Sequence, residues 1–378
     1  MCPATRVVLL TPPGRSAVAS LLVDGSSATN VVDLLFQPAG ERTLADQPCG
    51  RIVFGRWPSS TAAEEVVVCR RTEEQIEIHC HGGRAAARAL IATLTAQGCQ
   101  EIVWTEWVRQ TSDDPLVSDA RIVLAAALTE RTALLLWQQH EGSLRRAIEE
   151  VTRRIASGDL AAARCRIDEL LSWSSLGLHL TKPWRVVMTG RPNVGKSSLI
   201  NALVGYHRAI VHATPGTTRD IVNAATAVDG WPIELADTAG IRTGGETLER
   251  QGIDRARRNA LAADLVLLIF DRGRPWTDED AALAADWPQA LWVLNKCDLP
   301  SAAGFAGRSG IEVSAKQDTG IDELIVAIAR RLVPEVPAPD EALPFLPQHV
   351  EALNIADEAL ARDDSPAALA AFESFKGR

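Results

Sequence analysis

Hydrophobic residues in the first part of the chain form short runs separated by turn residues. Such runs are typical of β-strands, and helical spacing at residues 85–96 predicts one helix among them. We expect the strands at residues 6–10, 18–23, 51–54, 66–69, 75–79 and 101–104. This mixture predicts a small α+β domain over residues 1–115.

A helical period replaces the strand pattern from about residue 119. Apolar residues then recur every three or four positions, which places them on one face of a helix. The clearest set is Leu144, Ile148, Val151 and Ile155. A break at residues 157–159 and renewed apolar spacing from Leu160 predict a second helix. We therefore expect the antiparallel helices of a bundle over residues 116–182.

Apolar strands and helical patterns alternate over residues 183–334. The strand candidates are residues 184–189, 233–237, 265–270, 291–295 and 311–313, and a helix is expected at residues 321–332. This alternation is the signature of a mostly parallel sheet with helices on both faces.

A proline-rich stretch, residues 334–347, precedes a return to helical spacing at residues 349–375. Prolines at this density cannot form a helix, so we expect a stiff linker. A short helical segment cannot bury its own apolar face, so residues 335–378 should pack on the first helical part. The predicted multidomain fold is therefore an α/β domain inserted in a helical bundle and preceded by a small α+β domain.

The composition of the 378 residues narrows the class of partner. The formal net charge is −9, so the chain lacks the overall basic field that grips nucleic acid, and any RNA contact must be local or supplied by a partner. Seven cysteines lie scattered without metal-type spacing, which favours reduced thiols in the cytoplasm. No apolar run suits a signal peptide or a membrane span, so no membrane association is expected.

One glycine-rich segment, Gly190–Ser198, lies between a predicted strand and a predicted helix, which is the context of a phosphate-binding P-loop. Its backbone N–H groups and the helix N-terminus would surround a polyphosphate. Lys196 is expected to pair with the β- and γ-phosphates, and the Ser197 hydroxyl to reach Mg²⁺. The expected binding positions are Asn193, Val194, Gly195, Lys196, Ser197 and Ser198.

Two further motifs follow predicted strands, and one of them identifies the base. Asp298 can accept hydrogen bonds from the N1–H and amino groups of guanine, a pair of donors that adenine lacks. Asp237 can hold the Mg²⁺ shell, and the N–H of Gly240 can meet a γ-phosphate. The order of the motifs predicts a GTP site that includes Asp237, Thr238, Ala239, Gly240, Asn295, Lys296, Asp298, Ser314, Ala315 and Lys316.

The segment between the P-loop and Asp237 offers a nucleotide-dependent switch. Thr218, or alternatively Thr217, can complete Mg²⁺ coordination while the γ-phosphate is present. Ile241 stands where Ras-like enzymes place a water-orienting glutamine, so that mechanism is absent. The physical alternative is a later carboxylate, either Glu246 or Glu249.

Four segments resemble the tRNA-modification GTPases of the TrmE/MnmE type, within the TrmE–Era-like P-loop superfamily. They are GRPNVGKSS from Gly190, GTTRD from Gly216, DTAGIR from Asp237 and ERQGI from Glu249. The N-terminal segments TPPGR and HGG match more loosely. The resemblance implies an N-terminal folate-binding and dimerising domain, a helical domain and an inserted GTPase domain.

The resemblance also implies a cation site and a catalytic group. Asn193 would ligate K⁺ beside the phosphates, where the ion supplies transition-state charge. Carbonyl groups of the following loop would complete that site, at His212, Thr214 and Thr217. Glu249 would orient the attacking water and act with Lys196 and Thr218, and dimerisation of the GTPase domains would order these elements.

The remaining implications concern tRNA modification. Glu77 and Arg121 match two family contacts to a tetrahydrofolate derivative, whereas Leu22 stands where the family has an arginine. The family implies a homodimer and an FAD-dependent partner of the MnmG/GidA type, with indirect contact to tRNA. Where the family ends in Phe-Cys-Ile-Gly-Lys, this chain reads Phe375-Lys376-Gly377-Arg378. Two alternatives therefore stay open, a GTP-dependent RNA- or ribosome-associated switch without modifying activity and a nucleotide-binding scaffold.

Overall fold

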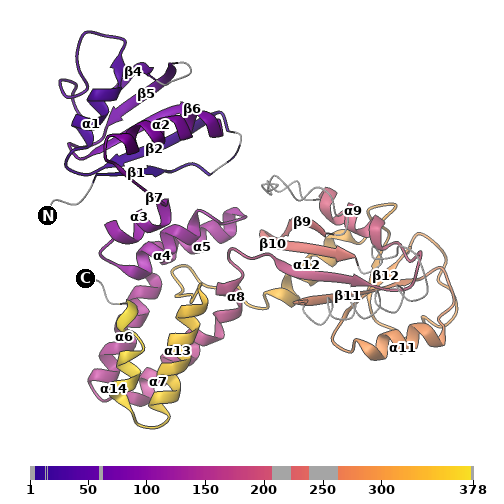
Figure 1. Ribbon diagram of the computed structural model, residues 1–378. Coiled ribbons are helices and arrows are strands. Elements are labelled where there is room, and N and C mark those ends of the chain that lie inside the picture. The colour runs from indigo at the N-terminus through magenta and orange to yellow at the C-terminus, as the bar shows by residue number, and fades with distance from the viewer. Residues whose placement is uncertain are drawn as a thin grey trace, which may run out of the picture. The chain divides into compact units, whose positions relative to one another are not determined.

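The computed structural model describes residues 5–12, 14, 16–58, 63–206, 223–237 and 263–375 (Figure 1). The chain divides into two compact units, Met1–Asp113 and Asp114–Arg378. Each unit contains an apolar core of its own. The finer domain boundaries expected after residues 115, 182 and 334 stay predictions.

The first unit is built on a seven-stranded sheet in the order β3-β4-β5-β6-β2-β1-β7. Neighbouring strands are antiparallel, except that β1 and β7 are parallel. Helices α1 (Ala28–Leu35) and α2 (Arg84–Ala96) pack their apolar sides on this sheet. The strands are β1 (Arg6–Leu9), β2 (Val18–Asp24), β3 (Gln37–Pro38), β4 (Ile52–Trp57), β5 (Glu64–Arg70), β6 (Gln75–His81) and β7 (Gln100–Ile102).

Two helices of the first unit differ from the sequence expectation. A strand is predicted over residues 101–104, but β7 ends at Ile102 and helix α3 (Trp104–Thr111) begins two residues later. A long-range contact favours the helix, because the indole Nε1 of Trp107 donates a hydrogen bond to Asp24 Oδ2 at 2.9 Å. Helix α1 lies where the sequence predicts no element, since its eight residues give only about two turns of periodic pattern.

The second unit begins with the predicted helical bundle. Its helices are α4 (Pro115–Leu124), α5 (Glu130–His140), α6 (Ser143–Ala156), α7 (Leu160–Ser172) and α8 (Ser174–Leu178). The predicted apolar face of α6 is buried throughout, and the side chain of Asp159 caps α7 by accepting a hydrogen bond from Ala162 N. Among the helices of the described residues, none combines the length and apolarity needed to cross a bilayer.

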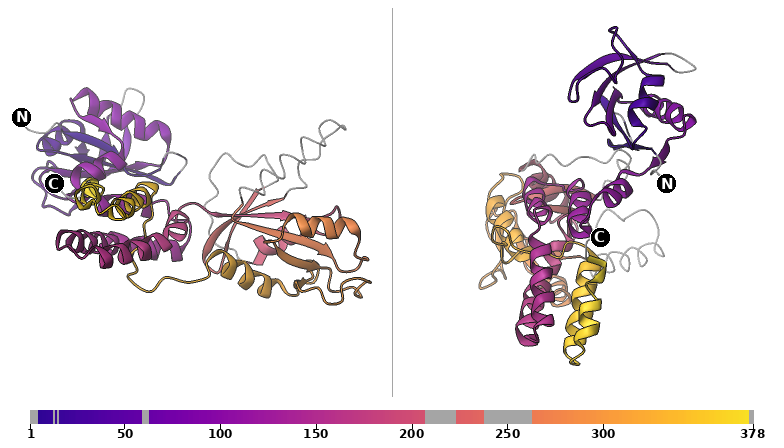
Figure 2. Two further views of the ribbon diagram at one scale, coloured as in Figure 1. Left: turned by 90° about the horizontal axis from the view of Figure 1, so that it is seen from below. Right: turned by 90° about the vertical axis from the view of Figure 1, so that its left-hand side faces the viewer.

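The helices at the end of the chain return to this bundle. Helix α13 (Pro347–Leu360) packs against α7, and α14 (Ser365–Ala370) packs against α6, as Figures 1 and 2 show. On α13, Asp357 pairs with Arg164 of α7 at 3.0 Å, and the buried His349 lies 3.6 Å from Asp119 of α4. The prediction that the α/β part is inserted in a helical bundle is therefore confirmed.

The outgoing and returning chains touch at Gly177 of α8. A Cβ atom at this position would lie 2.3 Å from the carbonyl oxygen of Pro344, so only glycine fits. Pro347 is expected in a non-helical linker, but it lies in the first turn of α13. Proline is tolerated there because the first N–H groups of a helix have no partner within it.

The inserted part contains a six-stranded sheet in the order β13-β12-β11-β8-β10-β9. The sheet is parallel apart from β9, and helices α9 and α12 pack on one face while α11 packs on the other. This confirms the predicted α/β architecture. The elements are β8 (Trp184–Thr189), α9 (Lys196–Tyr206), β9 (Asn223–Val228), β10 (Trp231–Asp237), β11 (Leu265–Asp271), α11 (Asp278–Asp286), β12 (Leu291–Asn295), β13 (Ile311–Val313) and α12 (Ile321–Leu332).

The sequence does not predict the edge strand β9, because three of its six residues are alanines and its alternation is weak. It joins β10 through Asp229 and Gly230, which both have positive φ. Arg131 of α5 lies against this turn. Its guanidinium pairs with Asp229 at 3.1 Å and lies 5.1 Å from the ring centroid of the buried Trp231. The turn of the hairpin therefore packs against the helical bundle.

Candidate nucleotide-binding site

The predicted motifs meet at one edge of the six-stranded sheet. The P-loop follows β8, Asp237 ends β10, Asn295 ends β12, and Ser314 comes directly after β13. These strands are parallel, so their carboxyl ends lie at the same edge, where open α/β sheets bind ligands.

The P-loop has a backbone that requires glycine at two positions. Gly190 and Gly195 have φ of +153° and +99°. A Cβ atom at Gly190 would lie 2.4 Å from the carbonyl oxygen of Ile269, and one at Gly195 would lie 2.3 Å from Asn295 Nδ2. Asn193 also has a positive φ, of +65°, which asparagine tolerates better than most residues. The loop is therefore tightly curved and packed closely on its surroundings.

Lys196 places its charge inside this loop. The residue is buried, and its Nζ donates hydrogen bonds to the carbonyl oxygens of Gly190 at 2.9 Å and Arg191 at 2.8 Å. Phosphate oxygens are stronger partners for an ammonium group than neutral carbonyl oxygens. The lysine thus lies where a polyphosphate held by the loop would meet it.

Ser197 and Asp237 provide the ligand types that Mg²⁺ prefers. The Ser197 hydroxyl donates a hydrogen bond to Asp237 Oδ2 at 3.2 Å, although the two residues are 40 positions apart. Mg²⁺ in nucleotide sites usually has few protein ligands and completes its shell with phosphates and water. One hydroxyl and one carboxylate side by side therefore fit the ion.

Asn295 joins the base-recognition segment to the P-loop. Its side chain is almost fully buried and donates from Nδ2 to the carbonyl oxygen of Val194 at 2.8 Å. Its Oδ1 accepts from the backbone N–H groups of Lys296 at 2.8 Å and Ala315 at 3.3 Å. One amide therefore ties together three of the predicted segments.

Asp298 is held in place by the segment after β13. Its Oδ1 accepts a hydrogen bond at 2.7 Å from the hydroxyl of the buried Ser314. Lys316, two residues after Ser314, is exposed to solvent. Burial raises the pKa of the thiol of Cys297, the residue before Asp298, above its ordinary value, and Glu312 and Asp298 add to the effect. That thiol therefore stays protonated near neutral pH and carries no charge beside Asp298.

Several predicted site residues lie outside the described residues. They are His212, Thr214, Thr217, Thr218, Thr238, Ala239, Gly240, Glu246 and Glu249. The folate candidates Glu77 and Arg121 belong to different units. Glu77 on β6 pairs with Arg71 at 3.0 Å and lies opposite the buried Leu22 on β2.

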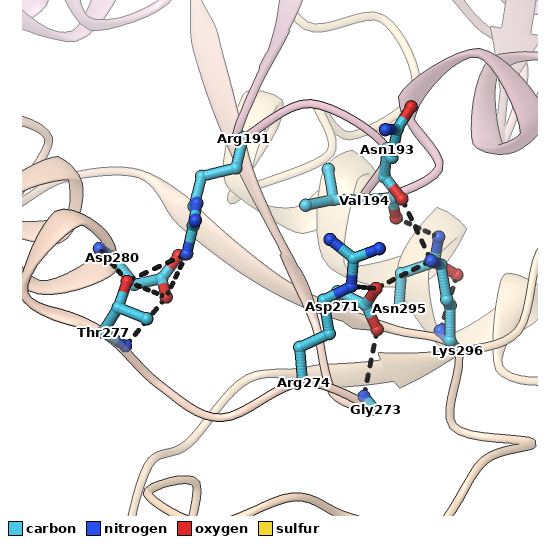
Figure 3. Close-up of polar contacts among 10 residues, drawn as sticks. All are labelled: Arg191, Asn193, Val194, Asp271, Gly273, Arg274, Thr277, Asp280, Asn295 and Lys296. Carbon is cyan, nitrogen blue, oxygen red and sulfur yellow. Dashed lines mark hydrogen bonds and ion pairs between the residues drawn. The ribbon is translucent and has the colours of Figure 1, made fainter.

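Sequence reasoning missed Asp271, which ends β11. Its Oδ2 lies 2.7 Å from Nζ of Lys296, and the same Nζ donates to the carbonyl oxygen of Asn193 at 3.0 Å, as Figure 3 shows. A signal was present in the sequence, because Asp271 ends a buried apolar strand in the same way as Asp237.

The second missed residue is Arg191 of the P-loop. In Figure 3 its side chain extends toward the start of α11, away from Asn193. Its Nη1 donates to Thr277 Oγ1 at 2.9 Å and lies 3.4 Å from Asp280 Oδ2, and the same two residues form the capping box of α11. The arginine fixes the outside of the P-loop to a helix terminus.

Comparisons with known proteins agree with this geometry. The family described as 50S ribosome-binding GTPase matches residues 185–296. The tRNA modification GTPase MnmE of Geobacillus kaustophilus is 33% identical over 374 residues, which cover 86% of this chain and 81% of that protein. The protein of the same name from Bacillus subtilis is 31% identical over 373 residues, with coverage of 86% and 81%.

Two solved structures are similar to parts of the chain. One is Aquifex aeolicus Era bound to GDP and aluminium fluoride, with 25% identity and a TM-score of 0.32, covering 46% of this chain and 66% of that one. The other is the FeoB G-domain of Methanococcus jannaschii, with 24% identity and a TM-score of 0.29, covering 40% and 98%.

Proposed function

Since this chain belongs to the MnmE family of tRNA modification GTPases and is a GTP hydrolase, we propose that K⁺ and dimerisation of its GTPase domain stimulate the hydrolysis, and that the activity serves modification of the wobble uridine of tRNA. The observation that supports the GTP site most directly is the hydrogen bond from Asn295 Nδ2 to the carbonyl oxygen of Val194 at 2.8 Å. It makes the phosphate loop and the base-recognition segment parts of one site.

The residues of the site have different roles in the proposed hydrolysis. Lys196 neutralises charge on the β- and γ-phosphates, and Asp298 accepts the hydrogen bonds of guanine. Ser197 and Asp237 would hold Mg²⁺, which when bound supplies positive charge to the phosphate oxygens. Glu249 orients the attacking water.

Exchange of the base tests the role of Asp298. Asp298→Asn replaces one acceptor by a donor, so the variant should prefer xanthosine triphosphate to GTP. Competition between the two nucleotides for a fluorescent GDP analogue measures the preference. A variant that still prefers GTP would remove guanine recognition from Asp298.

The position of Asn193 supports a K⁺ site beside the phosphates. Its carbonyl oxygen is held by Lys296 at 3.0 Å, while its exposed amide points away from that contact in Figure 3. Hydrolysis should therefore be faster in KCl than in NaCl at equal ionic strength, and Asn193→Ala should abolish the difference. Asn201→Ala, an exposed amide on α9, is the matched control. Equal rates in the two salts would exclude the cation role.

Two glutamates of one segment, Glu246 and Glu249, are candidates for the catalytic carboxylate, and substitution of each distinguishes them. Glu249→Ala should lose turnover while binding GTP as tightly as the unchanged protein, because orienting water contributes only to the transition state. Glu246→Ala is the matched control and should keep its turnover. The reverse result would transfer the role to Glu246.

A regulatory switch without tRNA modification is the second candidate. The buried Leu22 opposite Glu77 favours it, since an apolar side chain cannot replace a cationic contact to folate. Titration with 5-formyl-tetrahydrofolate decides between the two functions. Binding would support the modification pathway, with a homodimer, an FAD-dependent partner of the MnmG/GidA type and indirect contact to tRNA. Absence of binding would support the switch.

A further inference from the structure

Lys296 is shared between two structural partners at the edge of the sheet. Its Nζ lies 2.7 Å from Asp271 Oδ2 and donates to the carbonyl oxygen of Asn193 at 3.0 Å. Asp271 ends β11, Lys296 follows β12, and Asn193 belongs to the P-loop after β8. One ammonium group therefore connects three segments that are far apart in the sequence.

Asp271 has the environment of a fixed carboxylate. Its side chain is only 6% exposed, and its Oδ1 accepts a hydrogen bond from the N–H of Gly273 at 3.0 Å. A buried carboxylate needs a close counter-charge, because loss of its hydration is unfavourable. Arg274 lies 3.4 Å away but is 65% exposed, so solvent screens its contribution. Lys296 is therefore the counter-charge that matters.

The backbone of Lys296 makes this contact relevant to the base. Its φ is +66°, an unusual conformation for a residue with a long side chain. The residue lies between Asn295, which is bonded to Val194, and the guanine-binding candidate Asp298. A shift of the Lys296 ammonium would therefore move both the P-loop at Asn193 and the segment that carries Asp298.

We propose that Asp271 is a positioning residue for the guanine nucleotide. By holding the ammonium of Lys296, it keeps the P-loop and the carboxylate of Asp298 at the separation that one nucleotide spans. The inference rests on the proposed recognition of guanine by Asp298, which the exchange to xanthosine triphosphate tests separately. Failure of that exchange would refute the base assignment, whatever the Asp271 variants show.

The test is a double-mutant cycle in the full chain. Asp271→Asn keeps the shape of the side chain but removes its charge, and Lys296→Met keeps most of the alkyl length but removes the ammonium. Charged hydrogen bonds contribute about 1.5–3 kcal/mol, so each variant should bind a fluorescent GDP analogue about 10- to 100-fold more weakly. If Asp271 acts through Lys296, the double variant should be no weaker than the weaker single variant. Losses that multiply in the double variant would overturn the proposal.

A second readout separates positioning from general loosening of the domain. Inosine nucleotides lack the amino group of guanine, so the ratio of GDP to inosine diphosphate affinities reports how well Asp298 is placed. This ratio should fall toward one in Asp271→Asn, and it should stay unchanged in Arg274→Ala, the control that removes the screened partner. An unchanged ratio in Asp271→Asn would overturn the proposal.

A further variant, Asp271→Glu, tests the proposal if Asp271→Asn is unstable. Asp271→Glu keeps the charge but displaces it by one methylene group, and it should lose affinity by less than Asp271→Asn. Affinity equal to that of the unchanged protein in both variants would refute a positioning role. Thermal unfolding of the nucleotide-free variants confirms that the compared proteins are folded.

Discussion

The close approach of Gly195 to Asn295 leads to a quantitative prediction for Gly195→Ala. The added Cβ atom would lie 2.3 Å from Asn295 Nδ2, well inside van der Waals contact. The amide of Asn295 cannot move aside freely, because it is buried and donates to the carbonyl oxygen of Val194 at 2.8 Å. The P-loop must therefore shift, or this hydrogen bond must break.

The size of the effect follows from two contributions. A residue with a side chain at φ of +99° is less stable than glycine by about 1–2 kcal/mol. Overpacking of a tight site adds about 1–3 kcal/mol. The sum, roughly 2–5 kcal/mol, corresponds to a loss of about 30-fold to several thousand-fold in GDP affinity if the cost falls on the nucleotide-bound conformation.

The assay is titration of the nucleotide-free protein with a fluorescent GDP analogue, together with GTP turnover at saturating substrate. Gly205→Ala is the matched control, because Gly205 lies in α9 without a positive φ, and a Cβ atom added there would meet no atom within 4 Å beyond its chain neighbours and the backbone of its own helix. Alanine is preferred to glycine within helices by about 1 kcal/mol, so the control should bind GDP normally. Equal GDP affinity for Gly195→Ala and Gly205→Ala would refute the packing argument.

Two further predictions concern the helical bundle. Arg131→Ala removes the contact with Trp231 and a solvent-screened pair with Asp229, so unfolding should occur about 2–4 °C lower, as for a loss near 1 kcal/mol; an unchanged midpoint in thermal unfolding would contradict it. Burial lowers the pKa of His349 below its ordinary value despite the nearby Asp119, so the unfolded chain binds a proton that the folded chain does not. Stability should therefore fall as the pH drops through about 6.5, the ordinary value for histidine, and His349→Leu should reduce this fall between pH 7.5 and 5.5 in thermal unfolding; an equal fall in both proteins would refute it.

Elements with a strong local pattern are the easiest to predict from the sequence. The bounds of β8, β12, β13 and α12 agree with the expectation residue for residue. The strands β8 and β12 are mostly apolar segments that end at polar residues, and the buried residues of α12 recur at helical spacing. The start of helix α3 is wrongly predicted as part of a strand, since a hydrogen bond from Trp107 to Asp24, 83 positions away, favours the helix. Local pattern carries no information on such a partner.

The candidate site shows the same division. Motif spacing leads to Lys196, Asn295 and Asp298, and the structure brings their segments together. The roles of Asp271 and Arg191 depend on contacts with side chains of other elements, Lys296 and Thr277 respectively. No fixed spacing in the sequence predicts such contacts. Terminal position on a buried strand is the only signal for Asp271, and many strands end in aspartate for turn reasons alone.

The contact between Gly177 and Pro344 has an engineering consequence. The chain leaves the bundle after Gly177 and returns to it at Pro344, so the two attachment points of the intervening chain are close together. A guest with adjacent termini needs only a short bridge there, and loop-closure entropy grows slowly with the length of what is inserted. The bundle should therefore accept other domains at this site. A fluorescent reporter or the GTPase domain of a relative could replace the inserted part.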